Sequence, residues 1–275
     1  MSALDDIRAI RIEKIKKLTA AGMPAYPADS HQTHTIKEAA DSFEKLSTES
    51  ATVTLVGRVL SLRAQGALIF VDLNDGTGKM QALLKQGEIE EGLFILFSEA
   101  VDVGDFVEVS GTFFTTKRGE KTVAVKDWRM LTKSIRPLPD EWYGLKDEDE
   151  RYRKRYLDIL LNQDVADIVR KRSIFWNTMR QFLLSRDYVE VETPVLENVT
   201  GGADARPFVT HHNALDIDVF LRISVGELWQ KKLLVAGLPK VFEIGRIFRN
   251  EGMSAEHLQD YTQMEFYQAY SDFRE

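Results

Sequence analysis

The feature that most constrains this chain is a series of short segments, between residues 52 and 131, that are rich in β-branched and aromatic residues. Alternation of apolar and polar side chains over roughly four to eight positions is typical of a strand with one buried face. Five segments are predicted to be strands: Thr52–Val59, Ala67–Leu73, Met80–Leu84, Phe106–Phe113 and Lys121–Leu131. Over this stretch the periodicity of the sequence therefore changes from that of helices to that of strands.

The connections between these strands narrow the choice of architecture. Asp75-Gly76-Thr77-Gly78 predicts a hairpin turn between the second and third strands, and Gln86–Ala100, between the third and fourth, has helical potential. Five short strands with a helix between the third and fourth are the pattern of an OB-fold barrel. Such barrels commonly bind single-stranded nucleic acid on the face of strands two and three.

Composition limits the classes of protein to which the chain can belong. Its 275 residues suffice for one large or two ordinary domains. The absence of cysteine excludes disulfides, thiolate zinc sites and cysteine nucleophiles. A net charge of -7 means that any RNA contact must be local, on a basic face of an otherwise acidic protein. Because there is neither a signal peptide nor an apolar run of bilayer length, a soluble, cytoplasmic protein without membrane contact is expected.

The sequence around the barrel predicts a second domain, and the fold class is α+β. Ser2–Gly22 predicts a helix whose many basic residues either face solvent or contact phosphate. We predict a helix-plus-barrel domain over 1–139, a linker over 140–163 and a second domain over 164–275. The elements expected in the second domain are helix Asp164–Tyr188, a strand ending at Pro194, strand Val219–Ser224, helix Gly226–Ala236, and an antiparallel pair, Lys240–Arg249 and Thr262–Ala269.

The strongest chemical signal is Phe248-Arg249-Asn250-Glu251-Gly252, at the end of one strand of this pair. Alternate residues of a strand share a face, so Arg249 and Glu251 are expected on one side, as are Glu265 and Tyr267 of the next strand. Arginine binds phosphate bidentately, and a buried carboxylate pairs well with an ammonium group. This set suits a nucleotide plus a cationic small molecule, although the arginine and glutamate alone could equally form a surface ion pair.

Several of these segments resemble one family. Phe248–Gly252 looks like motif 2 of the class II aminoacyl-tRNA synthetases, and Tyr188–Pro194 looks like motif 1. Further stretches are similar to the lysyl-tRNA synthetases in particular: Arg136–Pro139, Arg151–Asp158, Gly201–Phe208 and Thr210–Asp216. The resemblance covers nearly the whole chain. It implies an anticodon-binding OB barrel followed by the first part of an antiparallel-sheet catalytic domain, which activates lysine with ATP and transfers it to tRNA(Lys).

The resemblance implies an ATP site and a mechanism without a protein nucleophile or general base. Arg249 would bridge the α-phosphate of ATP and the lysine carboxylate, and it is the one catalytic residue expected. Glu251 would hydrogen-bond the adenine amino group, Tyr261 would stack on adenine, and His257 would contact the outer phosphates. Catalysis would then consist of positioning and electrostatic stabilisation.

The resemblance also implies the contacts to lysine and to a second subunit. Gly202 would allow close approach of the backbone to the substrate, which a side chain would block. Glu227 and Glu265 would hold the side-chain ammonium or the α-amino group of lysine, and Tyr267 would complete the site. Pro194 would lie at a homodimer interface.

The anticodon contacts implied for the barrel come from four residues: Arg63, Phe70, Gln81 and Glu120. Phe70 would stack on a base, Gln81 and Arg63 would contact base edges, and Glu120 would lie close by. A core position for Phe70 stays open, because its neighbours Ile69 and Val71 compete for the inward face.

The sequence departs from the family pattern in three ways. It ends before the third motif of the class, where the Mg²⁺ ligands of the family also lie, so no metal ligand is expected in this chain. One residue more than usual precedes Glu227, and Leu258-Gln259 replaces the usual Asn-Pro. If these residues are the whole polypeptide, no adenylation is expected; a longer parent is expected to be active.

Two alternatives remain. The first is a tRNA-binding module with an incomplete catalytic site. The second is an aspartyl- or asparaginyl-tRNA synthetase, which shares the layout of the two domains. A site for aspartate needs arginine or lysine, whereas the candidates Glu227 and Glu265 are acidic, and this favours lysine.

Overall fold

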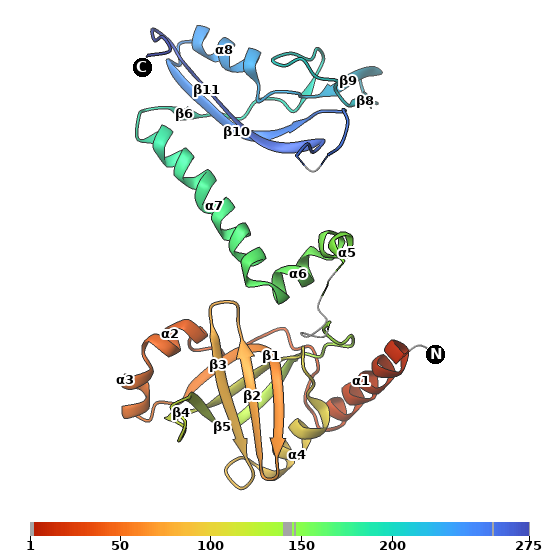
Figure 1. Cartoon of the computed structure of the whole chain (residues 1–275), viewed down its shortest axis with the longest axis vertical. Helices are drawn as coiled ribbons and strands as arrows, with labels where there is room; N and C mark the ends of the chain where they lie inside the picture. Colours follow the sequence, from red (N-terminus) through yellow and green to blue (C-terminus); the bar gives the residue numbers. More distant parts are fainter. Residues whose placement is uncertain (1–2, 140–144, 146, 255, 275) are drawn as a thin grey trace. The chain divides into compact units, whose positions relative to one another are not determined.

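The computed structural model describes residues 3–139, 145, 147–254 and 256–274. The chain divides into two compact units, Met1–Lys146 and Asp147–Glu275, each with mixed α and β structure (Figure 1). Part of the predicted linker, residues 140–144 and 146, lies outside the described residues, as does Ser2 of the predicted first helix. Among the described residues, no helix combines the length and apolarity needed to cross a membrane.

The first unit is built around five strands. Its elements are α1 (Ala3–Ala20), α2 (Ile36–Asp41), α3 (Phe43–Thr48), β1 (Val53–Gln65), β2 (Leu68–Asn74), β3 (Lys79–Lys85), α4 (Glu91–Ala100), β4 (Phe106–Thr115) and β5 (Lys121–Thr132). The strand order β1-β2-β3-β5-β4 closes into a barrel because β1 pairs with both β2 and β4. All neighbours are antiparallel except β3 and β5, which are parallel. The five predicted strands and the helix between the third and fourth are confirmed (Figure 1).

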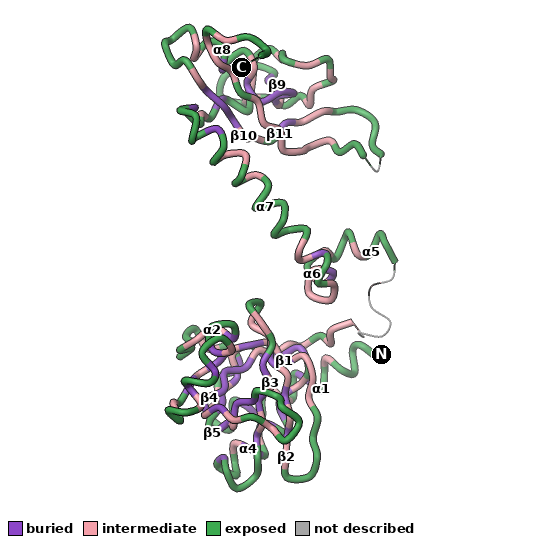
Figure 2. Tube along the Cα trace, turned by 60° about the vertical axis from the view of Figure 1, so that its left-hand side comes forward, coloured by how far each residue is buried: buried purple, intermediate pink, exposed green. Residues whose placement is uncertain are grey.

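Strand alternation fills the interior of this barrel and leaves the other positions for function. On β2, Ile69, Val71 and Leu73 are buried, whereas the residues between them are only partly covered (Figure 2). Phe97 of α4 is fully buried and its ring lies 4.8 Å from that of Trp128, edge to face. Full burial of one such side chain stabilises the fold by about 1.5–3 kcal/mol, so Phe97→Ala would damage the barrel most directly through the cavity it leaves.

The basic helix α1 directs much of its charge toward its own domain. Arg11 is buried and donates hydrogen bonds to the carbonyls of Ser134 (2.9 Å), Arg136 and Val103 (both 3.2 Å). Two ion pairs also join α1 to the rest of the first unit: Lys14 with Asp102 (2.7 Å) and Lys17 with Glu99 (2.8 Å). These three cations therefore anchor the helix to its own domain. The sequence had suggested that they either face solvent or contact phosphate.

The second unit contains two small sheets. Its elements are α5 (Glu148–Arg153), α6 (Arg155–Leu161), α7 (Gln163–Leu184), β6 (Val189–Glu190), β7 (Leu196–Glu197), β8 (Val209–His212), β9 (Ile217–Leu221), α8 (Glu227–Val235), β10 (Lys240–Phe248) and β11 (Asp260–Gln268). One sheet has the order β11-β10-β6 and the other β7-β9-β8. The predicted antiparallel pair is confirmed, with Glu243 opposite Glu265 and Gly245 opposite Gln263.

The structure corrects the bounds of two predicted elements and the placement of one pair of residues. The helix expected from Gln86 begins only at Glu91, because Gly87 has a φ of 83° and interrupts any helix there. The strand expected over Val219–Ser224 ends at Leu221. Arg249 and Glu251 were expected to share a strand face, but β10 ends at Phe248 and both residues lie in the loop that follows.

Candidate functional site

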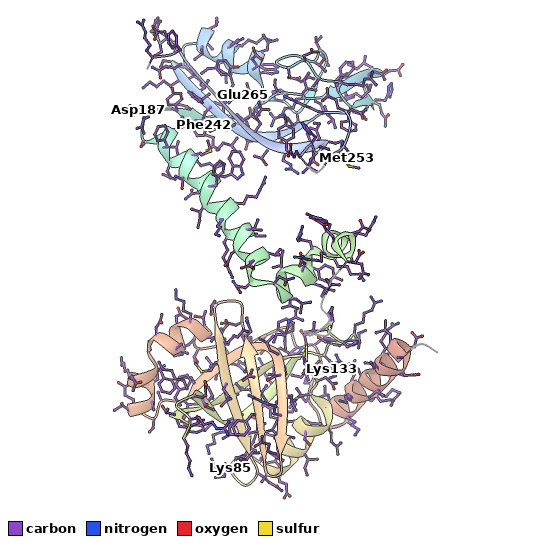
Figure 3. All side chains as sticks on the ribbon, in the orientation of Figure 1. Lys85, Lys133, Asp187, Phe242, Met253 and Glu265 are labelled. Carbon is purple, nitrogen blue, oxygen red and sulfur yellow. The ribbon has the colours of Figure 1, made fainter. Side chains whose placement is uncertain are left out.

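One face of the β10–β11 hairpin carries the second unit's candidate substrate contacts. Tyr261, Gln263, Glu265 and Tyr267 alternate along β11 and therefore point to the same side. Figure 3 labels Glu265 and Phe242 on the hairpin and Met253 in the loop that joins its strands. Three of the four side chains are linked, because Glu265 accepts hydrogen bonds from Gln263 Nε2 (3.1 Å) and from the Tyr267 hydroxyl (3.2 Å).

The carboxylate of Glu265 is also fixed from another segment. The backbone N–H of Val225 donates to Glu265 Oε1 at 3.1 Å. Burial, together with the negative charges of Glu265 and Glu227, raises the pKa of the Tyr267 hydroxyl far above its ordinary value. Tyr267 therefore stays a neutral hydrogen-bond donor, and the two carboxylates give this region a negative potential that favours a cation.

A second acidic group stands beside this cluster. Glu227 is the first residue of α8, and its Oε1 accepts a hydrogen bond from Lys231 Nζ at 2.6 Å. The same ammonium group lies 5.8 Å from the centre of the Tyr267 ring. Gly202, with a φ of 85°, lies so close that a Cβ on it would be 2.8 Å from Glu227 Oε2 and would collide with Ser224 Oγ. The Lys231–Glu227 contact is a pair one helical turn apart within α8, and the lysine side chain is half exposed.

The segment from Arg222 to Glu227 joins these parts. Its Val225 N–H donates to Glu265, as described above, and its Ile223 carbonyl accepts a hydrogen bond from Arg249 Nε at 3.4 Å. Gly226 begins α8 with the left-handed φ of 62°, and a side chain there would collide with Thr193 Oγ1. Glycine adopts this conformation without the strain that a side chain would bring.

A buried ion pair lies beside the candidate substrate contacts, because Glu243 stands directly opposite Glu265 on the hairpin. Arg222 Nη1 donates to Glu243 Oε1 at 2.5 Å, and both side chains are almost completely inaccessible, at 4% and 5%. Thr193 donates to Glu243 Oε2 through its hydroxyl (2.7 Å) and its backbone N–H (3.1 Å). The pair therefore links Thr193 to strand β10. It also links both to Arg222, the first residue of the segment whose backbone is hydrogen-bonded to Arg249 and Glu265.

The candidate nucleotide-binding residues are only partly brought together. The guanidinium of Arg249 lies 5.7 Å from the centre of the Tyr261 ring. Glu251 Oε1 accepts a hydrogen bond from the Arg206 backbone N–H at 3.3 Å. His257 is exposed and lies within its own loop, with Nδ1 at 2.8 Å from Ser254 Oγ. Among the described residues, neither Glu251 nor His257 is hydrogen-bonded to Arg249.

The residues expected to contact the anticodon lie on neighbouring strands at the outer face of the barrel. Arg63 on β1 lies opposite Phe70 on β2, and Asp72 on β2 lies opposite Gln81 on β3. Phe70 is half-buried between the fully buried Ile69 and Val71, so its ring faces outward and the core alternative is wrong. Strand alternation thus presents an aromatic ring beside polar side chains, as expected of a sheet that stacks nucleobases.

Polar contacts hold this outer face in place. Arg63 Nη2 lies 3.2 Å from Asp72 Oδ2. Gln81 Oε1 accepts a hydrogen bond from the Thr122 hydroxyl at 3.0 Å. The same hydroxyl lies 3.2 Å from the carbonyl oxygen of Glu120, whose exposed side chain stands at the β4–β5 turn. Glu120 is therefore at the edge of the strands that carry Gln81 and Phe70.

Comparison with known proteins identifies both units. Residues 147–275 match the family model described as tRNA synthetases class II (D, K and N), and residues 53–131 match that of the OB-fold nucleic acid binding domain. The chain is 45% identical over 273 residues to a lysine–tRNA ligase of Moorella thermoacetica, covering 99% of this chain and 55% of that protein. The chain belongs to the class II tRNA synthetases of the D, K and N group.

Other relatives of this class II synthetase carry the same name. Lysine–tRNA ligases of Clostridium botulinum strain Langeland and of Halalkalibacterium halodurans are 45% and 44% identical. These matches cover 96% and 99% of this chain but 52% and 55% of the relatives. The chain therefore spans about half the length of the curated relatives it matches. The site on the hairpin lies in the part matched by the synthetase model, and the outer face of the barrel lies in the part matched by the OB-fold model.

The sequence alone did not point to several residues of this synthetase site. Val225, Gln263 and Lys231 contact the candidate carboxylates, and the Arg222–Glu243 pair supports them. One signal was available: Glu243 interrupts an apolar strand between Phe242 and Ile244, and a carboxylate inside such a strand needs a buried cation. Pro194 is exposed, next to the buried Thr193.

Proposed function

We propose that this chain provides the tRNA-binding barrel and part of the adenylation site of a lysine–tRNA ligase. In the reaction, the carboxylate of lysine attacks the α-phosphorus of ATP and pyrophosphate leaves. A hydroxyl group at the end of tRNA(Lys) then attacks the carbonyl carbon of the lysyl-adenylate, and AMP leaves. The observation that carries the assignment of lysine is a pair of carboxylates at the neutral Tyr267: Glu265, which accepts a hydrogen bond from its hydroxyl at 3.2 Å, and Glu227, whose charge also acts on that hydroxyl.

Each candidate residue has a physical task in this proposal. Arg249 would bind the α-phosphate and the substrate carboxylate together and stabilise the charge that develops between them. Tyr261 would stack on adenine, Glu251 would accept from its amino group, and His257 would contact the outer phosphates. Gly202 leaves room for the substrate, because a side chain there would meet Ser224 and Glu227.

The barrel would bind the anticodon of tRNA(Lys). Phe70 would stack on one base, and Arg63 and Gln81 would contact base edges beside Glu120. A homodimer with Pro194 at its interface, and a cytoplasmic location consistent with the cysteine-free sequence, belong to the same proposal. Mg²⁺ would accompany ATP in this proposal; among the described residues no group of three or more His, Cys, Asp or Glu side chains could hold a metal ion.

Lysine-dependent exchange of pyrophosphate into ATP tests the proposal on the full-length gene product. We expect exchange with lysine and not with aspartate or asparagine. Arg249→Ala should lower the rate by about 100- to 1,000-fold, because removing one preorganised charge-stabilising group commonly has this effect. Exchange with aspartate would overturn the assignment of lysine. Silence with every amino acid, with tRNA binding retained, would favour a tRNA-binding module instead.

A further inference from the structure

Gln263 carries a buried acceptor that nothing in its surroundings satisfies. Its Oε1 is inaccessible to solvent and has no hydrogen-bond donor among the described residues. Buried polar side-chain atoms in native proteins nearly always have a partner, and those without one call for an explanation such as a ligand or an ordered water. The unsatisfied atom lies on β11, within the site already described, and not in a remote part of the core.

The identity of this atom as an oxygen follows from its neighbour. The other end of the amide lies 3.1 Å from Glu265 Oε1. Because a carboxylate only accepts hydrogen bonds, that end must be the NH₂ group, and exchanging the two ends would bring two oxygens together. Glu265 therefore fixes the amide orientation, and the carbonyl oxygen is the end without a donor.

The position of Gln263 along the strand suggests which donor is missing. It stands between Tyr261 and Glu265 on the same face, at a spacing of about 7 Å from each along an extended strand. It lies opposite Gly245, and the guanidinium of Arg222 covers that glycine, since a Cβ there would be 2.1 Å from Arg222 Nη2. Among the described residues Arg222 donates no hydrogen bond to Gln263. An ammonium group has three N–H donors. One carboxylate cannot satisfy all three in a half-buried site, and a neutral carbonyl next to that carboxylate adds an acceptor without adding charge repulsion.

We propose that Gln263 is a substrate-binding residue whose carbonyl oxygen accepts a hydrogen bond from a primary ammonium group of the bound amino acid, beside Glu265. The inference rests on the proposed function, since it takes a cationic amino acid as the ligand. Glu265 would supply the charge, Tyr267 would orient that carboxylate, and Gln263 would complete the coordination of the ammonium. An uncharged analogue would leave the carbonyl oxygen buried without a donor, so Gln263 would also contribute to specificity.

The test compares Gln263→Met and Gln263→Leu with the unaltered full-length gene product in ATP–pyrophosphate exchange. Both variants replace the amide with an apolar side chain of similar size and remove the acceptor together with the Nε2 donor to Glu265. We expect KM for lysine to rise by about tenfold or more, because a hydrogen bond to a charged group is lost, while KM for ATP stays within about twofold. Gln268→Met is the matched control: the same substitution on the same strand, at a residue that instead bonds the Tyr188 hydroxyl.

Two inhibitors identify which ammonium is bound. 6-Aminohexanoate keeps the side-chain amine of lysine, and norleucine keeps the α-amine. Selective loss of affinity for one of them in both variants supports the proposal and names the group. Unchanged KM for lysine, or equal increases in KM for lysine and ATP, would overturn it while leaving the ligase assignment intact. Absence of lysine-dependent exchange in the unaltered protein would instead remove the proposed function and this inference with it.

Discussion

The closed barrel and the open sheets of the second unit treat apolar side chains differently. In the first unit the inward side chains of five strands form one continuous buried cluster with residues of the surrounding helices (Figure 2). In the second unit, a small buried cluster consists of Leu183, Tyr188 and Phe242. Large apolar side chains of α7 are exposed instead: Ile168, Val169, Ile174, Phe175 and Phe182. A closed sheet has an inside to fill, whereas an open sheet of three strands has only its two faces.

This difference separates stability from binding in one unit and merges them in the other. On the barrel, Phe70 and Gln81 lie on the outer face, and the core is formed by the alternate positions. On the β10–β11 hairpin, the candidate substrate contacts are themselves half-buried and share their face with the Arg222–Glu243 pair. Substitutions at the barrel surface should therefore change binding alone, while substitutions in the buried pair beside the candidate contacts should change both binding and stability.

The largest effect is expected from Glu243→Ala, which leaves the buried guanidinium of Arg222 without its partner. Breaking a buried pair on one side commonly costs about 3–5 kcal/mol, so the second unit should lose this much of its free energy of unfolding. Denaturant unfolding combined with region-resolved hydrogen exchange would measure the loss, with the barrel unchanged. Arg246→Ala is the control, because its pair with Asp260 is about half exposed and should contribute at most about 1 kcal/mol. Equal losses in the two variants would remove the special role given to the buried pair.

A smaller effect, confined to binding, is expected from Phe70→Ala. Stacking of a base on an aromatic ring contributes about 1–3 kcal/mol, so affinity for a tRNA(Lys) anticodon stem–loop at fixed salt should fall by about 5- to 150-fold. Phe106→Ala, another half-buried aromatic on a barrel strand, is the matched control. Comparable losses of RNA affinity in both variants, or a drop in affinity that follows a drop in melting temperature, would break the separation of binding from stability.

The smallest effect concerns the edge of the barrel, at the turn before β3. Burial acts to raise the pKa of Asp75, but hydrogen bonds from the Ile36 backbone N–H, from Thr77 and from Gly78 hold its pKa below the ordinary value. The ionised carboxylate therefore stabilises the fold above an unfolded-state pKa of about 3.9, and this contribution disappears as the pH falls through the lower folded-state pKa.

Asp75→Asn should accordingly lower the stability of the first unit by about 1 kcal/mol at neutral pH. Thermal unfolding of the two proteins at neutral pH and at a pH below both pKa values would measure the difference, which should shrink in acid. A difference of the same size at both pH values would show that the charge of Asp75 contributes nothing.

Local patterns predicted the elements well wherever the periodicity of apolar side chains matched the backbone conformation. The barrel strands, the helix α7 and the pairing of β10 with β11 follow from periodicity and turn residues. The strand predicted over Val219–Ser224 was placed too far along the chain, because apolar residues continue past Leu221. In the structure the strand ends at Leu221, Arg222 is buried, and the backbone reaches a left-handed conformation at Gly226. Apolar character alone cannot distinguish a strand from an extended segment held by contacts from elsewhere.

The sequence by itself determined the family, the two units and most candidate residues, because motifs and periodicity are written in neighbouring positions. Only the tertiary structure decided which polar groups meet. It turned the cations of α1 toward the barrel, paired Glu243 with Arg222, brought Val225 to Glu265 and left the carbonyl of Gln263 without a donor. Buried polar groups take their partners from segments far away in the chain, such as Arg222 and Glu243 or Val225 and Glu265, and no local pattern records that distance.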